Sequence, residues 1–188
     1  TADDVARRIG YPCFVKPNAG GSSFGVSKVK SADELADALD KALMESHEAM
    51  IEHLLSGTEI TCGCYRRDDE LVVFPITEVV TSEEFFDYDA KYNGKVSEIT
   101  PARIAPETAD RVKRVTASIY EHLDCYGIIR IDYILSGEAG HETINLLEIN
   151  TTPGMTATSF IPQQVRAAGL EMKDVLADII EGKLNADD

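Results

Sequence analysis

The sequence predicts an α+β fold, in which short strands are mixed with amphipathic helices. Apolar residues recur at helical spacing in residues 31–46 and 106–125, whereas residues 11–17, 57–81 and 127–149 contain the apolar or alternating runs typical of strands. The 188 residues are 44% hydrophobic, which is enough for a buried core in one domain or in two small lobes. No repeat or low-complexity tract interrupts this pattern, as expected of a globular chain.

The overall charge and the cysteines limit the class of protein. A formal net charge of -15 argues against nucleic acid or an anionic membrane as the main partner, because phosphate groups attract clustered Lys and Arg. No apolar run approaches the roughly 18 residues of a membrane span, and the four cysteines lack paired metal-ligand spacing. We therefore expect a cytoplasmic protein. The first residue is Thr1 rather than Met, and TADDVARRIG has neither the basic start nor the apolar middle of a signal peptide, so we expect the sequence to begin within a longer protein.

Residues 1–55 are predicted to form two helices and three strands. TADDVARRIG is typical of a helix with Thr1 as N-cap that ends at Gly10. YPCFVKP and VSKVK are predicted to be strands on either side of the loop NAGGSSFG. A capping-box pattern, Ser31 with Glu34, opens the second helix, and AMIEHLL follows as a strand. Three leucines of this helix are expected to face the core: Leu35, Leu39 and Leu43.

The rest of the chain is predicted to contain several strands and three helices. GTEITCGCYRRDDELVVFPITEVVT indicates two or three strands, and residues 82–100 show little periodicity. A helix is expected to begin at Pro106, followed by GIIRIDYIL and TINLLEI as an antiparallel pair of strands. Two C-terminal helices, SFIPQQVRAAG and MKDVLADIIEG, are each predicted to end at a glycine, Gly169 and Gly182.

Two pairs of polar residues lie on the predicted antiparallel strands. Arg130 and Asp132 are two residues apart, as are Glu148 and Asn150, so each pair shares one face of its strand. If the strands pair, three oxygen-bearing side chains and one Arg converge, an arrangement suited to Mg²⁺ and phosphate. A surface salt bridge would explain two of these residues but not four, and Asn150 could simply start the turn at Pro153.

Three other segments carry residue types suited to a nucleotide, each with a simpler alternative. Lys16 precedes a Gly- and Ser-rich loop that could cradle phosphates or form a flexible hairpin turn. Lys91 and Tyr92 could close over phosphates or belong to a solvated loop. The segment IEHLLSGTE could present backbone groups to an adenine and a carboxylate to a ribose, or be an ordinary strand end.

The order of these motifs resembles the ATP-grasp domain of the D-alanine-D-alanine ligase family. The resemblance covers nearly the whole chain through VKPNAGGSSFGVSKV, IEHLLSGTEIT, FDYDAKY, RIDYIL and LLEINTTPGMT. It implies an α+β fold of two subdomains that grip ATP, with residues 1–80 as a smaller lid subdomain and residues 81–188 as a larger one that holds the metal. It also implies ATP-dependent joining of two D-alanines through D-alanyl phosphate for peptidoglycan precursors, with Mg²⁺ or alternatively Mn²⁺.

The resemblance implies a role for individual residues. Those of the nucleotide site are Lys16, Ser22, Ser23, Glu52, Leu54, Leu55, Glu59 and Lys91. The metal ligands are Asp132, Glu148 and Asn150, and the substrate-binding residues are Arg130, Gly154, Ser159 and Phe160. The catalytic set is Arg130, the backbone N–H of Gly154, Lys91, Tyr92 and Ser22. Within it, Arg130 and Gly154 stabilise an oxyanion, and Tyr92 favours an amine acceptor over lactate.

The resemblance has limits that are visible in the sequence. Gly20 and Phe160 stand where many members carry an acidic and a smaller apolar residue, respectively. The N-terminal substrate domain of the family is absent from these residues, so we expect a fragment that does not ligate alone and a homodimer only in the full-length enzyme. Two alternatives remain at this point: another ATP-grasp carboxylate-amine ligase, or an interaction module that keeps the fold without binding nucleotide.

Overall fold

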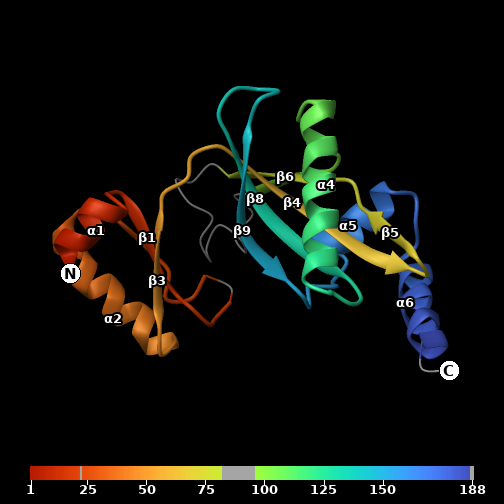
Figure 1. The fold of residues 1–188 in the computed structure, drawn as a ribbon, viewed down its shortest axis with the longest axis horizontal. Helices are drawn as coiled ribbons and strands as arrows, with labels where there is room; N and C mark the ends of the chain where they lie inside the picture. The colour runs from red at the N-terminus through yellow and green to blue at the C-terminus, as the bar shows by residue number, and fades with distance from the viewer. Residues whose placement is uncertain (22, 82–95, 187–188) are drawn as a thin grey trace. The chain divides into compact units, whose positions relative to one another are not determined.

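The computed structural model describes residues 1–21, 23–81 and 96–186. They divide into two compact units, whose elements are labelled in Figure 1. The first unit contains Thr1–Leu55, and the second contains Ser56–Val80 with the described residues from Ser97 onward. The sequence placed residues 56–80 in the first unit. They belong to the second because strand β4 (Thr58–Arg67) pairs with β6 (Thr77–Thr81) and β8 (Ile129–Ser136).

The first unit is a three-stranded antiparallel sheet covered by helices. Its elements are α1 (Ala2–Arg8), β1 (Cys13–Pro17), β2 (Ser27–Val29), a 3₁₀ turn η1 (Ala32–Glu34), α2 (Leu35–Glu45) and β3 (Ala49–His53). The strand order is β2-β1-β3, so β1 is central and β3 lies at an edge. The core joins α2 to β1 and β2 and consists of Cys13, Val15, Val29, Leu35, Ala38 and Ala42.

Local signals in this unit were partly right. The Thr1–Asp4 capping box of α1 is present as expected. The Ser31–Glu34 capping box is wrong, because Ser31 makes no side-chain cap bond and Glu34 instead accepts a hydrogen bond from the backbone N–H of Lys30. In α2 the buried residues are Leu35, Ala38 and Ala42, whereas Leu43, which was expected to face the core, is 47% exposed.

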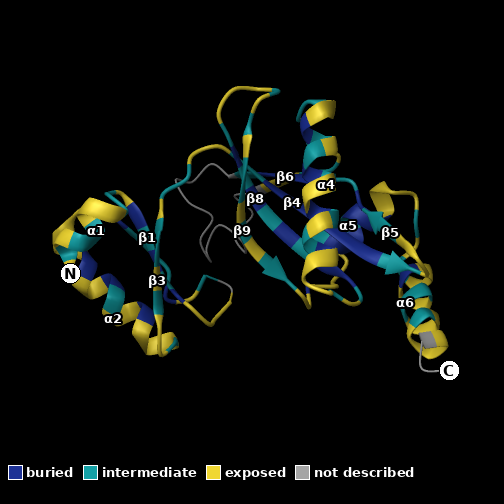
Figure 2. Cartoon of the chain, in the orientation of Figure 1, coloured by how far each residue is buried: buried dark blue, intermediate teal, exposed yellow. Residues whose placement is uncertain are grey.

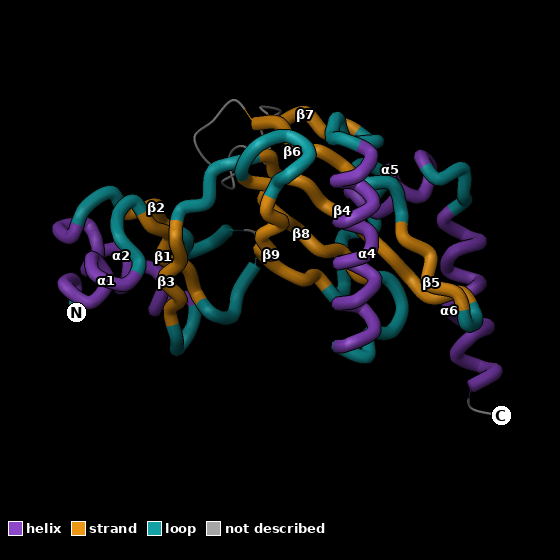
Figure 3. Tube along the Cα trace, turned by 45° about the horizontal axis from the view of Figure 1, so that its top comes forward, coloured by secondary structure: helices purple, strands orange, loops and turns teal. Residues whose placement is uncertain are grey.

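The second unit is a larger antiparallel sheet between helices (Figure 3). Besides β4, β6 and β8, its elements are β5 (Glu70–Val73), β7 (Val96–Ile99), α4 (Pro106–His122), β9 (Thr143–Asn150), α5 (Phe160–Ala167) and α6 (Met172–Ala186). The strand order is β7-β6-β4-β8-β9, and β5 also pairs with β4. The expected antiparallel pair is confirmed as β8 and β9. Gly182 does not end α6, which continues to Ala186, because glycine also adopts helical angles at modest cost.

The two faces of this sheet have different environments. One face packs its alternate apolar residues, such as Ile60 and Ile131, against Val112 and Tyr120 of α4. The opposite face meets α5 and α6 through a second cluster that includes Tyr65, Ile161 and Val175. Figure 2 shows the resulting mixture of dark, buried strands and helices with exposed outer sides. Gly63 and Tyr65 alternate with the core residues of β4, and α5 packs directly over Gly63, where a Cβ atom would collide with Ile161 and Gln164. Gly63 lies opposite Arg130 of β8, so this face also carries the polar residues of β8.

A buried glutamine closes a gap in this sheet. Along β4, pairing with β6 ends at Thr61 and pairing with β5 begins at Cys64. Gln164 of α5 is fully buried at this gap, where its Oε1 accepts from Gly63 N–H at 2.9 Å and its Nε2 donates to Thr61 O at 3.0 Å. The side-chain amide therefore substitutes for a missing strand partner and fixes α5 on the sheet.

Candidate functional site

Pairing of β8 with β9 brings four polar residues together. Arg130 lies opposite Asn150 and Asp132 lies opposite Glu148, while Ile131 between them is fully buried on the other face. The convergence predicted from the two-residue spacing is therefore confirmed. The pairing shifts register between Asp132 and Tyr133. The four polar residues therefore lie on one side of this irregularity, where β8 begins and β9 ends.

Hydrogen bonds link the quartet into one network. Arg130 donates from Nε and NH2 to the two carboxylate oxygens of Asp132, at 2.9 and 2.8 Å. Asn150 Nδ2 donates to Asp132 Oδ2 and to Glu148 Oε1, each at 3.1 Å. The Arg130 and Asp132 side chains are only 16% and 14% exposed, whereas Glu148 is 59% exposed. The network therefore has a buried end and an open, acidic end.

The guanidinium of Arg130 also contacts an aromatic ring. Its Cζ lies 5.2 Å from the centroid of Phe160, the first residue of α5. Burial alone would lower the pKa of Arg130, but the hydrogen bonds to Asp132 and the nearby Glu148 and Glu59 carboxylates raise it. Arg130 is thus a permanent cation, held by one carboxylate and one ring in a fixed direction.

The donor set fits a hard divalent cation. Asp132, Glu148 and Asn150 supply two carboxylates and an amide, the oxygen ligands that Mg²⁺ prefers. The amide now presents its N–H₂ group to both carboxylates, and turning that group by half a rotation would present Oδ1 to a metal instead. In the described part of the chain, no cluster of three or more His, Cys, Asp or Glu offers another metal site. Their roles as metal ligands remain predictions.

The turn after β9 brings Gly154 close to Ser159. A Cβ atom at Gly154 would lie 2.9 Å from Ser159 Oγ, so a side chain at this position would collide with the serine. Ser159 precedes α5, and its Oγ lies 2.8 Å from Thr156 Oγ1. Because Phe160 is the next residue, three predicted substrate contacts and Arg130 belong to one local group. Their roles in substrate binding stay predictions.

In the first unit, two predicted nucleotide-binding residues form an ion pair. Lys16 of β1 and Glu52 of β3 share one face of the antiparallel pair, and Lys16 Nζ lies 2.6 Å from Glu52 Oε2. Their side chains are 23% and 34% exposed. Leu54 and Leu55 lie just beyond β3, outside the sheet ladder, and their role at an adenine stays a prediction.

The remaining predicted site residues lie elsewhere or outside the described residues. Glu59 is on β4 in the second unit and contributes to the electrostatic environment of Arg130. Ser23 adopts a left-handed conformation with φ of 61°, within two tight turns of the glycine-rich loop. Ser22, Lys91 and Tyr92 fall outside the described residues, so their assigned roles remain predictions.

Sequence reasoning missed two polar features of the second unit. Glu78 of β6 is 8% exposed and accepts from the backbone N–H, Nε and NH2 of Arg103, at 3.1, 2.9 and 2.7 Å. The hydrogen bonds from the Arg103 side chain lower the pKa of Glu78. Thr61 is 1% exposed, and its Oγ1 has no hydrogen-bond partner among the described residues. The only sequence signal for either was a polar residue inside an apolar strand.

Comparison with a family model gives a match over almost the whole chain. The model described as D-ala D-ala ligase C-terminus matches residues 1–181.

No helix among the described residues is both long and apolar enough to cross a membrane.

Named relatives and solved structures agree with that match. The chain is 63% identical over 183 residues to a D-alanine--D-alanine ligase of Phocaeicola vulgatus, covering 97% of this chain and 56% of the relative. A protein of the same name from Bacteroides fragilis is 63% identical over 181 residues, with coverages of 96% and 55%. The chain therefore spans about half the length of these curated relatives.

Two solved structures share the fold. The structure of VanG D-Ala:D-Ser ligase from Enterococcus faecalis has a TM-score of 0.81 and 33% identity, covering 95% of this chain and 51% of that one. The structure of D-alanine--D-alanine ligase from Bacillus anthracis complexed with ATP has a TM-score of 0.77 and 31% identity, with coverages of 99% and 57%. The expected α+β, ATP-grasp class is confirmed by these neighbours.

Proposed function

The chain belongs to the D-ala D-ala ligase C-terminal family, and from this premise we propose that it is the ATP-binding, catalytic part of an enzyme that joins two D-alanines. In this reaction the γ-phosphoryl group of ATP passes to the carboxylate of one D-alanine, giving D-alanyl phosphate and ADP. The amine of a second D-alanine then attacks the acyl carbon, and phosphate leaves. The product, D-alanyl-D-alanine, would serve peptidoglycan synthesis.

The observation that carries this proposal is the hydrogen-bonded quartet at the ends of β8 and β9. Phosphoryl transfer to a carboxylate brings two anions together, so fixed cations must offset their repulsion. Asp132, Glu148 and Asn150 would hold Mg²⁺ or Mn²⁺, which supplies the positive charge that neutralises the transferring phosphoryl group. Arg130, already oriented by Asp132 and Phe160, supports a charged intermediate beside this position.

The turn after β9 has a separate role in the second step. A tetrahedral intermediate places negative charge on the former carbonyl oxygen, which needs donors aimed at it. The backbone N–H of Gly154 and the guanidinium of Arg130 are the donors in this proposal. The absence of a side chain at Gly154 leaves room for Ser159, which we assign to the carboxylate of the second D-alanine. Lys91 is assigned to the γ-phosphate and Tyr92 to selection of an amine acceptor.

The first unit would supply nucleotide contacts. Lys16 is suited to the α- and β-phosphates, and its ion pair with the Glu52 carboxylate supports this assignment to an anionic group. Glu52, Leu54 and Leu55 are assigned to the adenine, Glu59 to the ribose, and Ser22 and Ser23 to the phosphates. The full-length enzyme is proposed to act as a homodimer in the cytoplasm, without nucleic acid or membrane partners.

Phosphate release and nucleotide binding test this function. The complete enzyme should release phosphate from ATP when D-alanine and Mg²⁺ are present, and removal of either should stop it. The 188-residue chain should be stabilised by nucleotide with Mg²⁺, by about 2.7 kcal/mol at a hundredfold excess over Kd. The absence of any stabilisation at millimolar nucleotide would contradict the nucleotide site. Phosphate release with another amino acid, but none with D-alanine, would favour a different ATP-grasp carboxylate-amine ligase.

A separate experiment tests whether D-alanine or D-serine is the better acceptor amino acid. The VanG structure is named for D-Ala and D-Ser, whereas the relatives at 63% identity are named for D-alanine alone. We expect D-alanine to be the better acceptor. Competition between D-alanine and D-serine in one reaction, followed by mass analysis of the dipeptides, separates the two possibilities.

A further inference from the structure

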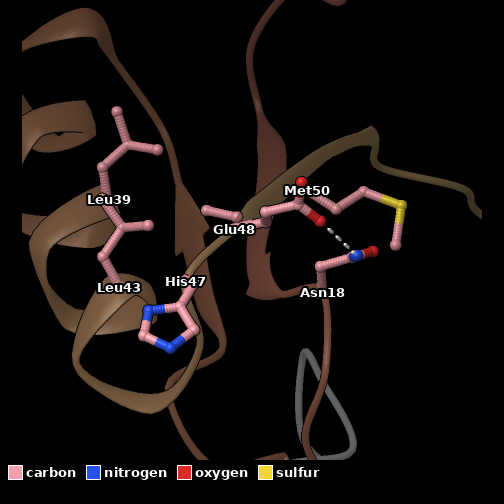
Figure 4. A pocket seen from close by; sticks show the side chains of 7 residues that line it. Asn18, Leu39, Leu43, His47, Glu48 and Met50 are labelled. Atoms are coloured by element: carbon pink, nitrogen blue, oxygen red, sulfur yellow. Dashed lines mark hydrogen bonds between the residues drawn. The ribbon is translucent and has the colours of Figure 1, made fainter.

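The glycine-rich loop that follows β1 is tied at its entrance to the turn between α2 and β3. The backbone N–H of Asn18 donates to Glu48 O at 2.8 Å, which extends the β1–β3 ladder by one residue. The side chains repeat this link, because Asn18 Nδ2 donates to Glu48 Oε2 at 2.8 Å. Figure 4 shows the two side chains meeting at a pocket that His47 also lines. One residue later, Ala19 N–H donates to Ser46 Oγ at 3.3 Å.

The exit of the same loop contacts the same helix. Gly25 has φ of +71°, and a Cβ atom there would lie 2.8 Å from Pro17 Cγ and 2.9 Å from Glu45 Cγ. The next residue, Val26, accepts a hydrogen bond from Lys41 Nζ at 3.5 Å. Both ends of the loop are therefore fixed to the C-terminal half of α2 and its following turn.

This attachment matters because of what a glycine-rich loop must do to bind phosphate. Gly and Ser residues allow many backbone conformations, and ordering them around a ligand costs conformational entropy. Fixing the two ends beforehand lowers that cost and increases affinity without adding a contact to the ligand. The exposed Asn18–Glu48 bond contributes little to the core, which is formed by other residues of α2.

We propose that Asn18 and Glu48 are positioning residues, which hold the entrance of the glycine-rich loop for binding the phosphates of the nucleotide. This inference rests on the proposed nucleotide site. Neither residue touches the ligand in this proposal. Asn18 acts through the backbone at Ala19, and Glu48 acts by accepting the amide hydrogen bond of Asn18.

A charge swap tests the link between these side chains. Asn18→Asp places two carboxylates against each other and should break the bond. Glu48→Gln alone keeps an oxygen that can accept from Asn18. The double variant Asn18→Asp, Glu48→Gln restores the bond in the opposite direction, because the new amide donates to the new carboxylate. His47→Ala is the matched control, since this exposed residue lies beside Glu48 in the same turn.

Two measurements give distinct outcomes. In the complete enzyme, Asn18→Asp should raise the KM for ATP about fivefold while kcat changes little, and in the 188-residue chain it should raise the Kd for ADP with Mg²⁺ by the same factor. The double variant should recover wild-type values. In the ligand-free chain, Asn18→Asp should also speed hydrogen exchange at the Ala19 amide. Unchanged affinity and exchange in Asn18→Asp, or no recovery in the double variant, would overturn the positioning role. No ADP binding by the wild-type chain would instead contradict the proposed function, and the exchange measurement would still test the loop attachment.

Discussion

Each unit contains an ion pair whose cation we assign to the reaction, but the carboxylates hold the two cations in different ways. Lys16 meets Glu52 through one contact, 2.6 Å between Nζ and Oε2, and both side chains are partly exposed. Arg130 meets Asp132 through two hydrogen bonds, both side chains are mostly buried, and Asn150 adds a third bond to the same carboxylate. The first pair can exchange its partner for a ligand, whereas the second is part of the fold.

The difference follows from side-chain chemistry and solvent. An ammonium group is a point charge on a flexible stem, and water screens its attraction to a carboxylate. A guanidinium is planar and matches a carboxylate with two parallel bonds, and burial weakens the screening. We therefore expect Lys16 to control ligand affinity with little effect on stability, and Asp132 to control both.

The largest expected effect is that of Asp132→Ala. This change leaves the buried guanidinium of Arg130 without its carboxylate, so the free energy of unfolding should fall by about 3 kcal/mol. In the complete enzyme, loss of this proposed metal ligand should also reduce phosphate release by at least about 100-fold. Urea denaturation and the phosphate assay measure the two effects. Asp110→Ala, which removes an exposed carboxylate of α4, is the control and should change neither. A stable but inactive Asp132→Ala would restrict the residue to the metal site.

The opposite pattern is expected for Lys16→Ala. Removal of this partly exposed ammonium group should change the free energy of unfolding by no more than about 1 kcal/mol. Loss of a phosphate contact should weaken nucleotide binding about tenfold or more, as measured by calorimetric titration with ADP and Mg²⁺. Lys30→Ala, at an exposed lysine beyond β2, provides a comparison for the loss of one positive charge. Equal affinities of the two variants would remove Lys16 from the nucleotide site.

The sequence predicted the polar quartet because strand geometry repeats every two residues. Arg130 and Asp132 must share a face, as must Glu148 and Asn150, and an antiparallel turn then brings the pairs together. The Glu78–Arg103 pair and the position of Gln164 could not be predicted in this way. Both depend on contacts between segments that are far apart in the sequence. Gln164, for example, occupies the gap along β4 between its pairing with β6 and its pairing with β5. The predicted roles of Ser31 and Gly182 were wrong for local reasons. Glu34 accepts a hydrogen bond from the backbone N–H of Lys30 instead of completing the capping box, and glycine also adopts helical angles.

A third ion pair, between Glu78 and Arg103, should make the stability of the second unit depend on pH. The carboxylate is buried while the Arg103 side chain is 64% exposed, and the hydrogen bonds from Arg103 lower the pKa of Glu78 below the ordinary value of a glutamate. A lowered folded-state pKa stabilises the protein above the unfolded-state value, and that contribution is lost as the pH falls through the folded-state pKa. Glu78→Gln should therefore lower the urea midpoint at about pH 7, and this difference should shrink as the pH falls below about 4. A constant difference over that range would show that the charge of Glu78 is not the source of its effect.

The smallest expected effect concerns an uncharged residue, Thr61, beside the Arg130–Asp132 ion pair. Thr61 lies opposite Asp132 in the β4–β8 register and opposite Thr77 in the β4–β6 register. Its buried Oγ1 has no hydrogen-bond partner in the described residues, and burying such a hydroxyl is unfavourable. Thr61→Val keeps the shape and removes the hydroxyl, so it should increase the free energy of unfolding by about 1 kcal/mol. Thr61→Ser keeps the hydroxyl but loses a methyl group, and it should be destabilising. If Thr61→Val instead destabilises the chain and weakens Mg²⁺ binding, the hydroxyl supports Asp132. Thr61 would then belong to the polar network that contains Arg130 and Asp132.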